Sequence, residues 1–236
     1  MSNSAKKNRI SFKDKLIGFK INSSVKKVTA FLKTIYGYFY KIFNIIGKVL
    51  AKWGVNANVV SIIGFVIGLL SINYLTREMY VQALICILIN RAFDAIDGAI
   101  AKHSKVTDFG VFLDATLDYV FYAAVIFGFA FAVPVKNALA AVFLLFAFAT
   151  SASAMLSFAV VAYKNKMSAS VDMKQSPFYL GGWAQGFETL IVFVLMCLFP
   201  HLFVPLAILL GLLCFVKAFS VAVTAYYTFV IAPRKK

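Results

Sequence analysis

The sequence predicts an all-α membrane protein in which six transmembrane helices follow an amphipathic juxtamembrane helix. The chain of 236 residues is 62% hydrophobic, whereas a soluble domain is about 45–50% apolar. Apolar runs of roughly 18 residues or more recur, and each can cross the ~30 Å hydrocarbon core as a helix. Half of the 24 Lys and Arg residues lie in residues 1–56, ahead of the first apolar run. This asymmetry favours anionic lipid headgroups over nucleic acid as the partner of the positive charge.

The amino-terminal 53 residues divide into two parts. Residues 1–24 read as a basic, polar tail without the apolar core and cleavage site of a signal peptide. In residues 25–53, apolar side chains recur every three or four positions and lysines interrupt them, which is typical of an amphipathic helix in the membrane interface. A helix packed on a protein core is the alternative, but the enrichment in Trp, Tyr and Lys favours the interface.

Residues 54–232 form the predicted six-helix transmembrane domain. From hydropathy and turn signals, the expected spans are roughly 57–75, 80–102, 107–133, 138–163, 182–200 and 202–230. The basic residues of the tails and connections fall on one side of the membrane, except Arg77 and Lys136. Because positively charged loops stay inside, we expect both termini and the acidic motif described next to face the cytoplasm.

Five of the nine acidic residues fall between Asp94 and Asp118. Asp94 and Asp97 are three positions apart near the end of the second span, whereas Asp114 and Asp118 are four apart near the start of the third. Each pair therefore lies on one face of its helix. Since the connection is short, we expect the two helices to be antiparallel neighbours. Their four carboxylates would then converge a turn or two inside the membrane.

Such a cluster needs compensating positive charge. One ionised Asp at the centre of a transmembrane helix costs roughly 2.5–3.5 kcal/mol, and four would also repel one another. Arg91 is the only basic residue expected to be buried in these two spans, and one guanidinium cannot neutralise four carboxylates. Carboxylate oxygens are preferred ligands of Mg²⁺, Mn²⁺ and Ca²⁺, and Mg²⁺ keeps positions open for substrate phosphates. The cluster therefore predicts one or two divalent cations that bind a diphosphate. Gly98 and Gly110 either admit that ligand or serve helix packing.

The acidic motif resembles that of the CDP-alcohol phosphotransferases, D-x2-D-G-x2-A-R-x8-G-x3-D-x3-D. The matching residues are Asp94, Asp97, Gly98, Ala101, Gly110, Asp114 and Asp118. Lys102 stands where the pattern has Arg, and seven residues rather than eight separate it from Gly110. Lys102 keeps the positive charge, but its ammonium cannot donate the two parallel hydrogen bonds of an arginine guanidinium. The shorter loop is similar to one bacterial branch of the family, and the likeness extends over about residues 55–230.

The resemblance implies metal-dependent transfer of a phosphatidyl group from a CDP-linked lipid, here expected to be CDP-diacylglycerol, to a small alcohol or phospho-alcohol in phospholipid biosynthesis. In this family, two Mg²⁺ or Mn²⁺ ions hold the diphosphate, the hydroxyl attacks the β-phosphorus and CMP leaves. Asp94, Asp97 and Asp114 would bind metal, and Asp118 would bind metal or act as general base. The residues implied to line the nucleotide are Gly98, Ala101, Lys102 and Gly110, with Asn58 and Ser61 from a looser motif.

The resemblance also implies a CDP-lipid, a small alcohol and the bilayer as partners, in the bacterial inner (cytoplasmic) membrane. The small residues of Ala149–Ala154 suit close helix contact between protomers, so we expect a homodimer. We expect no nucleic-acid partner. Gly64 and Gly68, four apart in the first span, are a weaker helix-packing signal.

Other readings of the charged residues stay open. A membrane carrier would use the carboxylates as a cation or proton site, and a family member could bind CDP-lipid without turnover. Acids gathered on two helix ends, without paired broken helices, favour the transferase. A phosphorylated acceptor would need cations such as Arg91, Lys164 and Lys217, although Arg91 can instead balance Asp94. An amino-alcohol acceptor would need an anion such as Glu188, which can instead pair with Lys217.

Overall fold

The computed structural model describes residues 41–165 and 186–231, and every regular element in those ranges is a helix. After a helical stretch at residues 41–52 come α3 (Ala57–Thr76), α4 (Tyr80–His103), α5 (Asp108–Ala132), α6 (Pro134–Lys164), α8 (Gly186–Leu198) and α9 (Phe203–Tyr226). A 3-10 turn, Pro200–Leu202, precedes α9, and a π-helical turn, Tyr227–Ile231, follows it. The predicted tail 1–24, the first part of the amphipathic helix (25–40), residues 166–185 and residues 232–236 lie outside the described residues.

Among the described residues, four helical segments are long and apolar enough to cross a membrane: Ala57–Thr76, Asp108–Ala132, Pro134–Lys164 and Pro200–Ile231. The chain is therefore an integral membrane protein. The other two predicted spans do not qualify. α4 is long enough but carries Arg91, Asp94 and Asp97, while α8 has only 13 described residues. Six transmembrane helices thus remain a prediction. α4 does not qualify as a span because of its charged residues, and α8 does not because of its length.

Side-chain caps begin α3 and α5. The side chain of Asn56 accepts a hydrogen bond from the Asn58 N–H (2.9 Å) at the start of α3. Thr107 accepts one from the Gly110 N–H (3.1 Å) at the start of α5. Both caps satisfy amide groups that the first helical turn leaves unpaired. α6 begins at Pro134, four residues before the predicted span, because proline is tolerated in the first turn of a helix.

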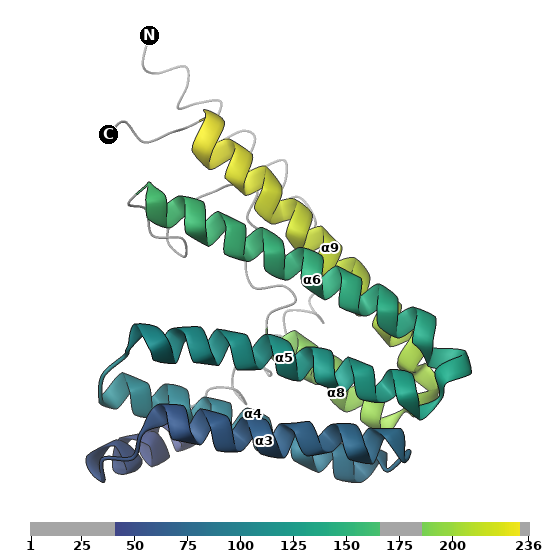
Figure 1. The fold of residues 1–236 in the computed structure, drawn as a ribbon, viewed down its shortest axis with the longest axis horizontal. Helices are drawn as coiled ribbons and strands as arrows, with labels where there is room; N and C mark the ends of the chain where they lie inside the picture. The colour runs from purple at the N-terminus through teal and green to yellow at the C-terminus, as the bar shows by residue number, and fades with distance from the viewer. Residues whose placement is uncertain (1–40, 166–185, 232–236) are drawn as a thin grey trace, which may run out of the picture.

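The helices form two groups that meet at one end and diverge at the other (Figure 1). α3 contacts both α4 and α5, α8 contacts α4, and α6 pairs with α9. We name the end where α5 turns into α6 and α8 into α9 the closed end. It includes Leu75, Phe129 and Phe203. The opposite end, where α4 ends and α5 begins at 103–108, is the open end.

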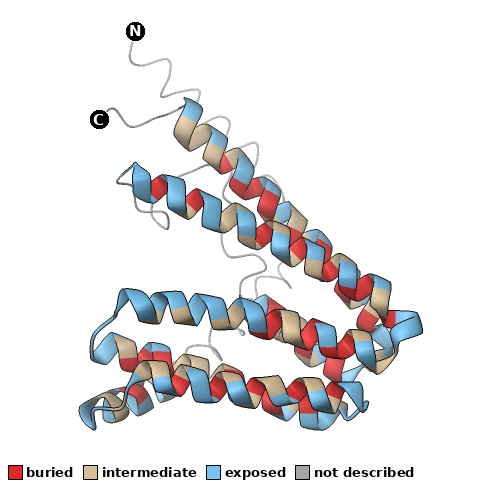
Figure 2. Cartoon of the chain, viewed as in Figure 1, coloured by how far each residue is buried: buried red, intermediate tan, exposed pale blue. Residues whose placement is uncertain are grey.

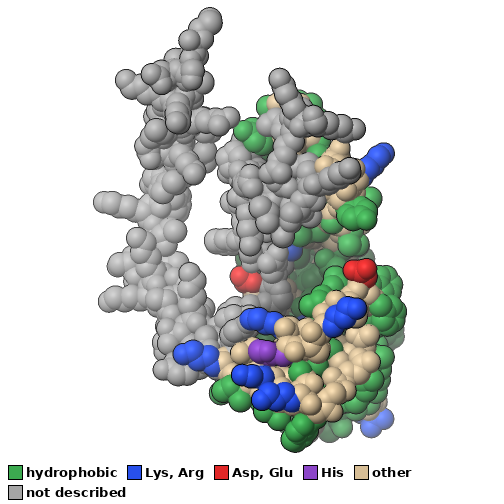
Figure 3. Space-filling model, turned by 90° about the vertical axis from the view of Figure 1, so that its left-hand side faces the viewer, with side chains coloured by type: hydrophobic (Ala, Val, Ile, Leu, Met, Phe, Trp, Pro, Cys, Tyr) green, Lys and Arg blue, Asp and Glu red, His purple; other side chains and the backbone are tan. Residues whose placement is uncertain are grey.

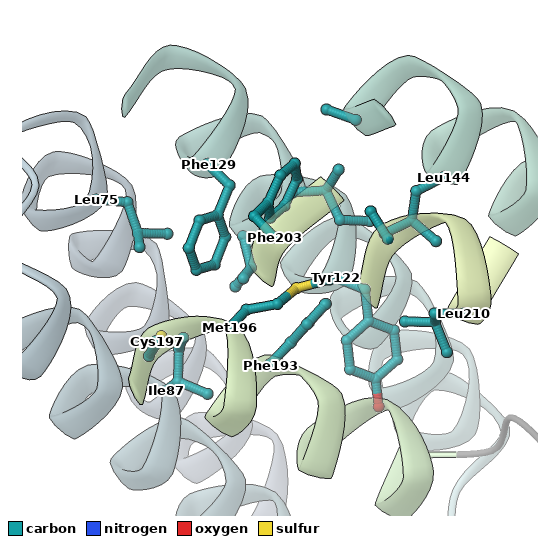
Figure 4. Close-up of a cluster of buried hydrophobic side chains, with 14 of the residues drawn as sticks. Leu75, Ile87, Tyr122, Phe129, Leu144, Phe193, Met196, Cys197, Phe203 and Leu210 are labelled. Carbon is teal, nitrogen blue, oxygen red and sulfur yellow. The ribbon is translucent and has the colours of Figure 1, made fainter. Parts of the chain in front are cut away.

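The main apolar core lies at the closed end (Figures 2 and 4). Phe129 of α5 stacks on Phe203 of α9 with ring centroids 4.9 Å apart, and on Tyr80 of α4 at 6.1 Å. Leu75 and Phe203 have no exposed surface. The helices of both groups are therefore joined by one continuous set of buried side chains at this end.

Glycines allow α3 to approach its two neighbours closely. Gly64 and Gly68 are buried, and a Cβ at Gly64 would collide with the Phe93 side chain of α4. A Cβ at Gly68 would lie 2.9 Å from both the Asn90 amide and the Phe121 ring. The packing role of these glycines is thus confirmed. As expected, α4 and α5 are neighbours, and their side chains meet directly, as in the ion pair between Arg91 and Asp118. Their backbones have little direct contact, because α3 packs against both.

Candidate active site

Three carboxylates meet at the open half of the molecule. Asp94 and Asp97 come from α4, and Asp114 comes from α5. One oxygen of each lies within 4.8 Å of the others. Asp97 is buried, Asp94 is half-buried and Asp114 is exposed. The spacing of three along α4 and the face that α5 presents produce this convergence, as the sequence predicted for these three residues.

Two adjoining cavities surround the carboxylates, and both include Ser61, Asp97 and Asp114. The smaller, about 10 Å³, is lined further by Phe65, Asn90, Arg91, Asp94, Leu117 and Asp118. The larger, about 100 Å³, lies toward the open end and is lined further by Ala57, Asn58, Gly98, Ala101, Lys105, Val106, Thr107, Gly110 and Val111. The carboxylates therefore stand between a small polar recess and a larger cavity.

Most residues predicted to line the nucleotide border the larger cavity: Asn58, Ser61, Gly98, Ala101 and Gly110. A Cβ on Gly98 would meet no atom within 4 Å, so this glycine leaves open space beside Asp97. Lys102 does not line the cavity, and its side chain is exposed. Lys105 supplies the cation there instead. The sequence analysis missed Lys105 and Thr107, although both lie in the short connection that joins the two halves of the motif.

The fourth carboxylate, Asp118, is held by an arginine. Its Oδ1 is 2.8 Å from Nη1 of Arg91, which also lies 3.6 Å from Oδ2 of Asp94. The Arg91 Nη1 donates to the Tyr122 hydroxyl (3.2 Å). The guanidinium carbon of Arg91 lies over two aromatic rings, 4.7 Å from the Phe121 centroid and 5.3 Å from that of Tyr122. Asp118 thus lies beside the three other carboxylates but is not one of the group that converges.

Asn90 fixes Arg91 from the other side. The side-chain oxygen of Asn90, Oδ1, accepts hydrogen bonds from Nε (2.9 Å) and Nη2 (2.6 Å) of Arg91. The side-chain nitrogen of Asn90, Nδ2, donates to the backbone carbonyl of Gly64 in α3 (3.0 Å). The side chain of Asn90 is buried and both of its polar atoms are paired, which also fixes the assignment of its oxygen and nitrogen. A polar chain therefore runs from α3 through α4 to α5.

The donor set fits a divalent metal ion. Asp94, Asp97 and Asp114 offer only carboxylate oxygens, which hard divalent cations prefer. Arg91 is already paired with Asp118, so it leaves most of the negative charge of the other three unbalanced. Carboxylates this close in a partly desolvated site repel one another strongly. A bound divalent cation would offset that repulsion.

The remaining charged candidates lie away from the carboxylates. Lys164 is exposed at the last residue of α6, and Glu188 is exposed near the start of α8. Lys217 is half-buried in α9, where the Glu188 charge is near enough to act on it. Neither Glu188 nor Lys217 lines the two cavities.

Basic side chains gather on the face of the open end (Figure 3). Exposed Lys48, Lys52, Lys102 and Lys105 belong to this region. The helical stretch 41–52 docks on the end of α4, where a Cβ on Gly47 would lie 2.8 Å from the Ala99 backbone. The His103 ring nitrogen and the Asn44 side-chain oxygen are 2.9 Å apart at the same contact. The described part of the predicted amphipathic helix thus adjoins the helix that carries Asp94 and Asp97.

Comparison with known proteins agrees with this arrangement. Inner membrane protein YnjF of Escherichia coli is 42% identical over 181 residues, which cover 77% of this chain and 88% of YnjF. Archaetidylinositol phosphate synthase of Pyrococcus horikoshii is 41% identical over 86 residues, covering 36% of this chain and 46% of that protein. An uncharacterized protein of Aquifex aeolicus is 32% identical over 83 residues, 34% of this chain and 42% of its own length. No solved structure gives a significant match.

The family assignment rests on a match that covers most of the chain. A sequence profile of the CDP-alcohol phosphatidyltransferases covers residues 54–231, which include α3 to α9 and both cavities. The family is one of transferases, so it supports an enzyme rather than the membrane carrier. This chain therefore belongs to the CDP-alcohol phosphatidyltransferase family.

Proposed function

We propose that this protein transfers a phosphatidyl group from a CDP-linked lipid, CDP-diacylglycerol, to the hydroxyl of a small alcohol or phospho-alcohol and releases CMP. One observation carries the proposal: the convergence of the Asp94, Asp97 and Asp114 oxygens within 4.8 Å, beside an open cavity of about 100 Å³. The carboxylates suit cations that bind a diphosphate, and the cavity lies next to them on the Gly98 side.

The residues of the site have distinct roles in this proposal. Asp94, Asp97 and Asp114 hold the metal, and the open space at Gly98 lets the diphosphate approach them. Asn58, Ser61, Ala101 and Gly110 shape the nucleotide cavity, with Lys105 as its cation. When bound, Mg²⁺ or Mn²⁺ would neutralise the diphosphate and the charge that develops during transfer. Asp118 either completes the metal site or accepts the proton of the attacking hydroxyl.

The acceptor alcohol depends on which charged side chains are available to bind it. Arg91 is engaged by Asp118, Asn90 and Tyr122, which leaves it poorly placed to bind an acceptor phosphate. Lys217 in α9 then becomes the first cation to test for a phosphorylated acceptor, and Glu188 the first anion for an amino alcohol. One relative is named for the synthesis of archaetidylinositol phosphate, so inositol phosphate belongs in the first acceptor panel.

The position in the membrane forms part of the same proposal. α4 and α8 would complete six spans, and residues 25–53 would lie in the interface. Lys41, Lys48 and Lys52 lie in the helical stretch that docks on the end of α4, Lys102 and Lys105 lie at or just after that end, and Lys164 is the last residue of α6. Arg77 and Lys136, at the end of α3 and the start of α6, lie at the closed end. By the positive-inside rule, the open end, both termini and the site face the cytoplasm. A homodimer through Ala149–Ala154 remains a prediction.

The proposed reaction is tested with purified protein in lipid nanodiscs. The protein is given CDP-diacylglycerol, Mg²⁺ or Mn²⁺, and glycerol 3-phosphate, inositol phosphate, serine or choline in turn. We expect metal-dependent CMP release with one acceptor and the matching lipid by mass spectrometry. The Asp118→Asn variant should release no CMP, while Arg77→Gln, a charge removed from an exposed loop at the closed end, should behave as wild type. Ion flux without CMP release would overturn the proposal and support a carrier.

A further inference from the structure

Arg91 occupies an unusual position, because its guanidinium lies 3.6 Å from Asp94, beside the converging carboxylates, and yet most of its N–H donors already have other partners. A guanidinium has five N–H donors. Its Nε and Nη2 donate to Asn90, and its Nη1 lies near Asp118 and Tyr122. Its side chain is 11% exposed. A role as a phosphate ligand would require several of these contacts to break.

We propose that Arg91 is a positioning residue with two linked effects. It fixes the Asp118 carboxylate through Oδ1, so that the other oxygen is held in a defined direction for metal or acceptor. It is also a permanent positive charge beside Asp94, which weakens the attraction of the three converging carboxylates for a metal ion. The first effect raises the rate of transfer, and the second keeps metal binding from becoming too tight. Its effect on transfer rests on the proposed function, whereas its effect on metal binding does not.

The surroundings of Arg91 show that its direction is built into the fold. Asn90 is locked to the Gly64 carbonyl of α3, and the absence of a side chain at Gly68 leaves the space in which Asn90 lies. Phe121 and Tyr122 lie close to the guanidinium, so it contacts little water. In such a site, a charge acts on its neighbours more strongly than at an exposed position. Three helices thus fix the orientation of one guanidinium.

The shape of arginine also matters. Lysine would keep the positive charge but has a single ammonium on a flexible stem. It cannot contact Asn90 with two nitrogens while it binds Asp118 and Tyr122. Arg91→Lys therefore keeps the positive charge but removes the several N–H donors of the guanidinium, and Arg91→Gln removes the charge and the guanidinium together.

The decisive measurement is Mn²⁺ binding without any CDP-lipid, by calorimetry and electron paramagnetic resonance. For Arg91→Gln we expect the Mn²⁺ dissociation constant to fall about tenfold because a repelling charge is lost, while kcat falls at least about tenfold. Arg91→Lys should bind Mn²⁺ within about threefold of wild type but lose kcat. Arg77→Gln is the matched control and should change neither. A purely structural role would weaken metal binding and activity together, which would overturn the proposal.

A double-mutant cycle covers the case in which Arg91→Gln does not fold. Asp118→Asn removes the closest ion-pair partner of Arg91, so that more of the Arg91 charge acts on the converging carboxylates, and it should weaken Mn²⁺ binding. Asp118→Asn/Arg91→Gln removes both charges, avoids a buried unpaired ion and should restore Mn²⁺ binding. If the double variant binds Mn²⁺ no better than Asp118→Asn, the proposal is wrong. Wild-type protein that binds Mn²⁺ but releases no CMP counts against the proposed function alone, because the binding arms still test Arg91.

Discussion

The closed and open ends of the molecule are built on opposite principles. At the closed end, aromatic and aliphatic side chains such as Leu75, Phe129 and Phe203 fill the space between helices of both groups. At the open end, α4 and α5 have little direct backbone contact, and polar side chains lie between them. The difference teaches that apolar packing at one end sets the spacing of the helices. The carboxylates at the other end can then converge although the backbones of α4 and α5 have little direct contact.

The largest difference between activity and stability is expected for a substitution of Asp114 at the open end. Asp114→Asn removes one of the converging carboxylate charges, and metal stabilisation of charge in transfer is worth several kcal/mol. We therefore expect CMP release to fall at least about 100-fold with no loss of thermal stability, because Asp114 is exposed. Activity and the melting curve in nanodiscs check this. A large fall in melting temperature would show that the open end, too, depends on this residue for its fold.

The opposite result is expected for Phe203→Ala at the closed end. Phe203 is fully buried and stacks on Phe129. Loss of a buried Phe side chain costs roughly 3–5 kcal/mol of stability. The melting temperature should fall clearly, while kcat per folded molecule stays within about threefold of wild type at low temperature. If kcat falls equally in protein shown to be folded, the two ends are not independent.

Two glycines in neighbouring helices give a sharper comparison. Gly64→Ala places a methyl group against Phe93, and such overpacking costs typically 1–3 kcal/mol. Gly98→Ala adds a methyl group in open space and, by helix propensity, should stabilise α4 by up to about 1 kcal/mol. We expect the first variant to lower the melting temperature and the second to keep it. Gly98→Ala should instead raise KM for CDP-diacylglycerol, which steady-state kinetics can measure; an unchanged KM would place the diphosphate elsewhere.

The smallest effect is expected in the loop between α3 and α4. Glu78 has φ = 57°, the left-handed conformation that glycine adopts at least cost. Its N–H still donates to the Leu75 carbonyl (2.9 Å), which closes the end of α3. Glu78→Gly should therefore raise stability by up to about 1 kcal/mol, and activity should not change. A rise in melting temperature of a few degrees would confirm it, and a fall would show that the Glu78 side chain makes a contact that matters.

Much of the site could be predicted because its information is local in the sequence. Helix periodicity places Asp94 and Asp97 on one face, and the short connection returns the chain to bring Asp114 near them. The polar caps Asn56 and Thr107 also stand where the helices begin. The family profile confirms the resemblance on which the roles of these residues were based.

The parts that could not be predicted depend on contacts between distant residues. Tyr122 is 31 positions from Arg91, and Asn90 is 26 positions from the Gly64 carbonyl, so no periodicity reveals either pair. The order of packing, with α3 against both α4 and α5, follows from Gly64 and Gly68, whose spacing also occurs by chance. An Asn next to an Arg within an apolar helix was the one available signal, because both need partners when buried.

The spacing of α4 and α5 at the open end bears on how the protein should be purified. A chelator would leave three neighbouring carboxylates with Arg91 and Lys105 to offset their repulsion, on two helices whose backbones have little direct contact. We expect these helices to separate at the open end in such a buffer while the aromatic contacts around Phe203 stay intact. Catalytic competence would then be lost well before helicity, and a preparation that looks folded by circular dichroism would need its divalent ion restored before any assay.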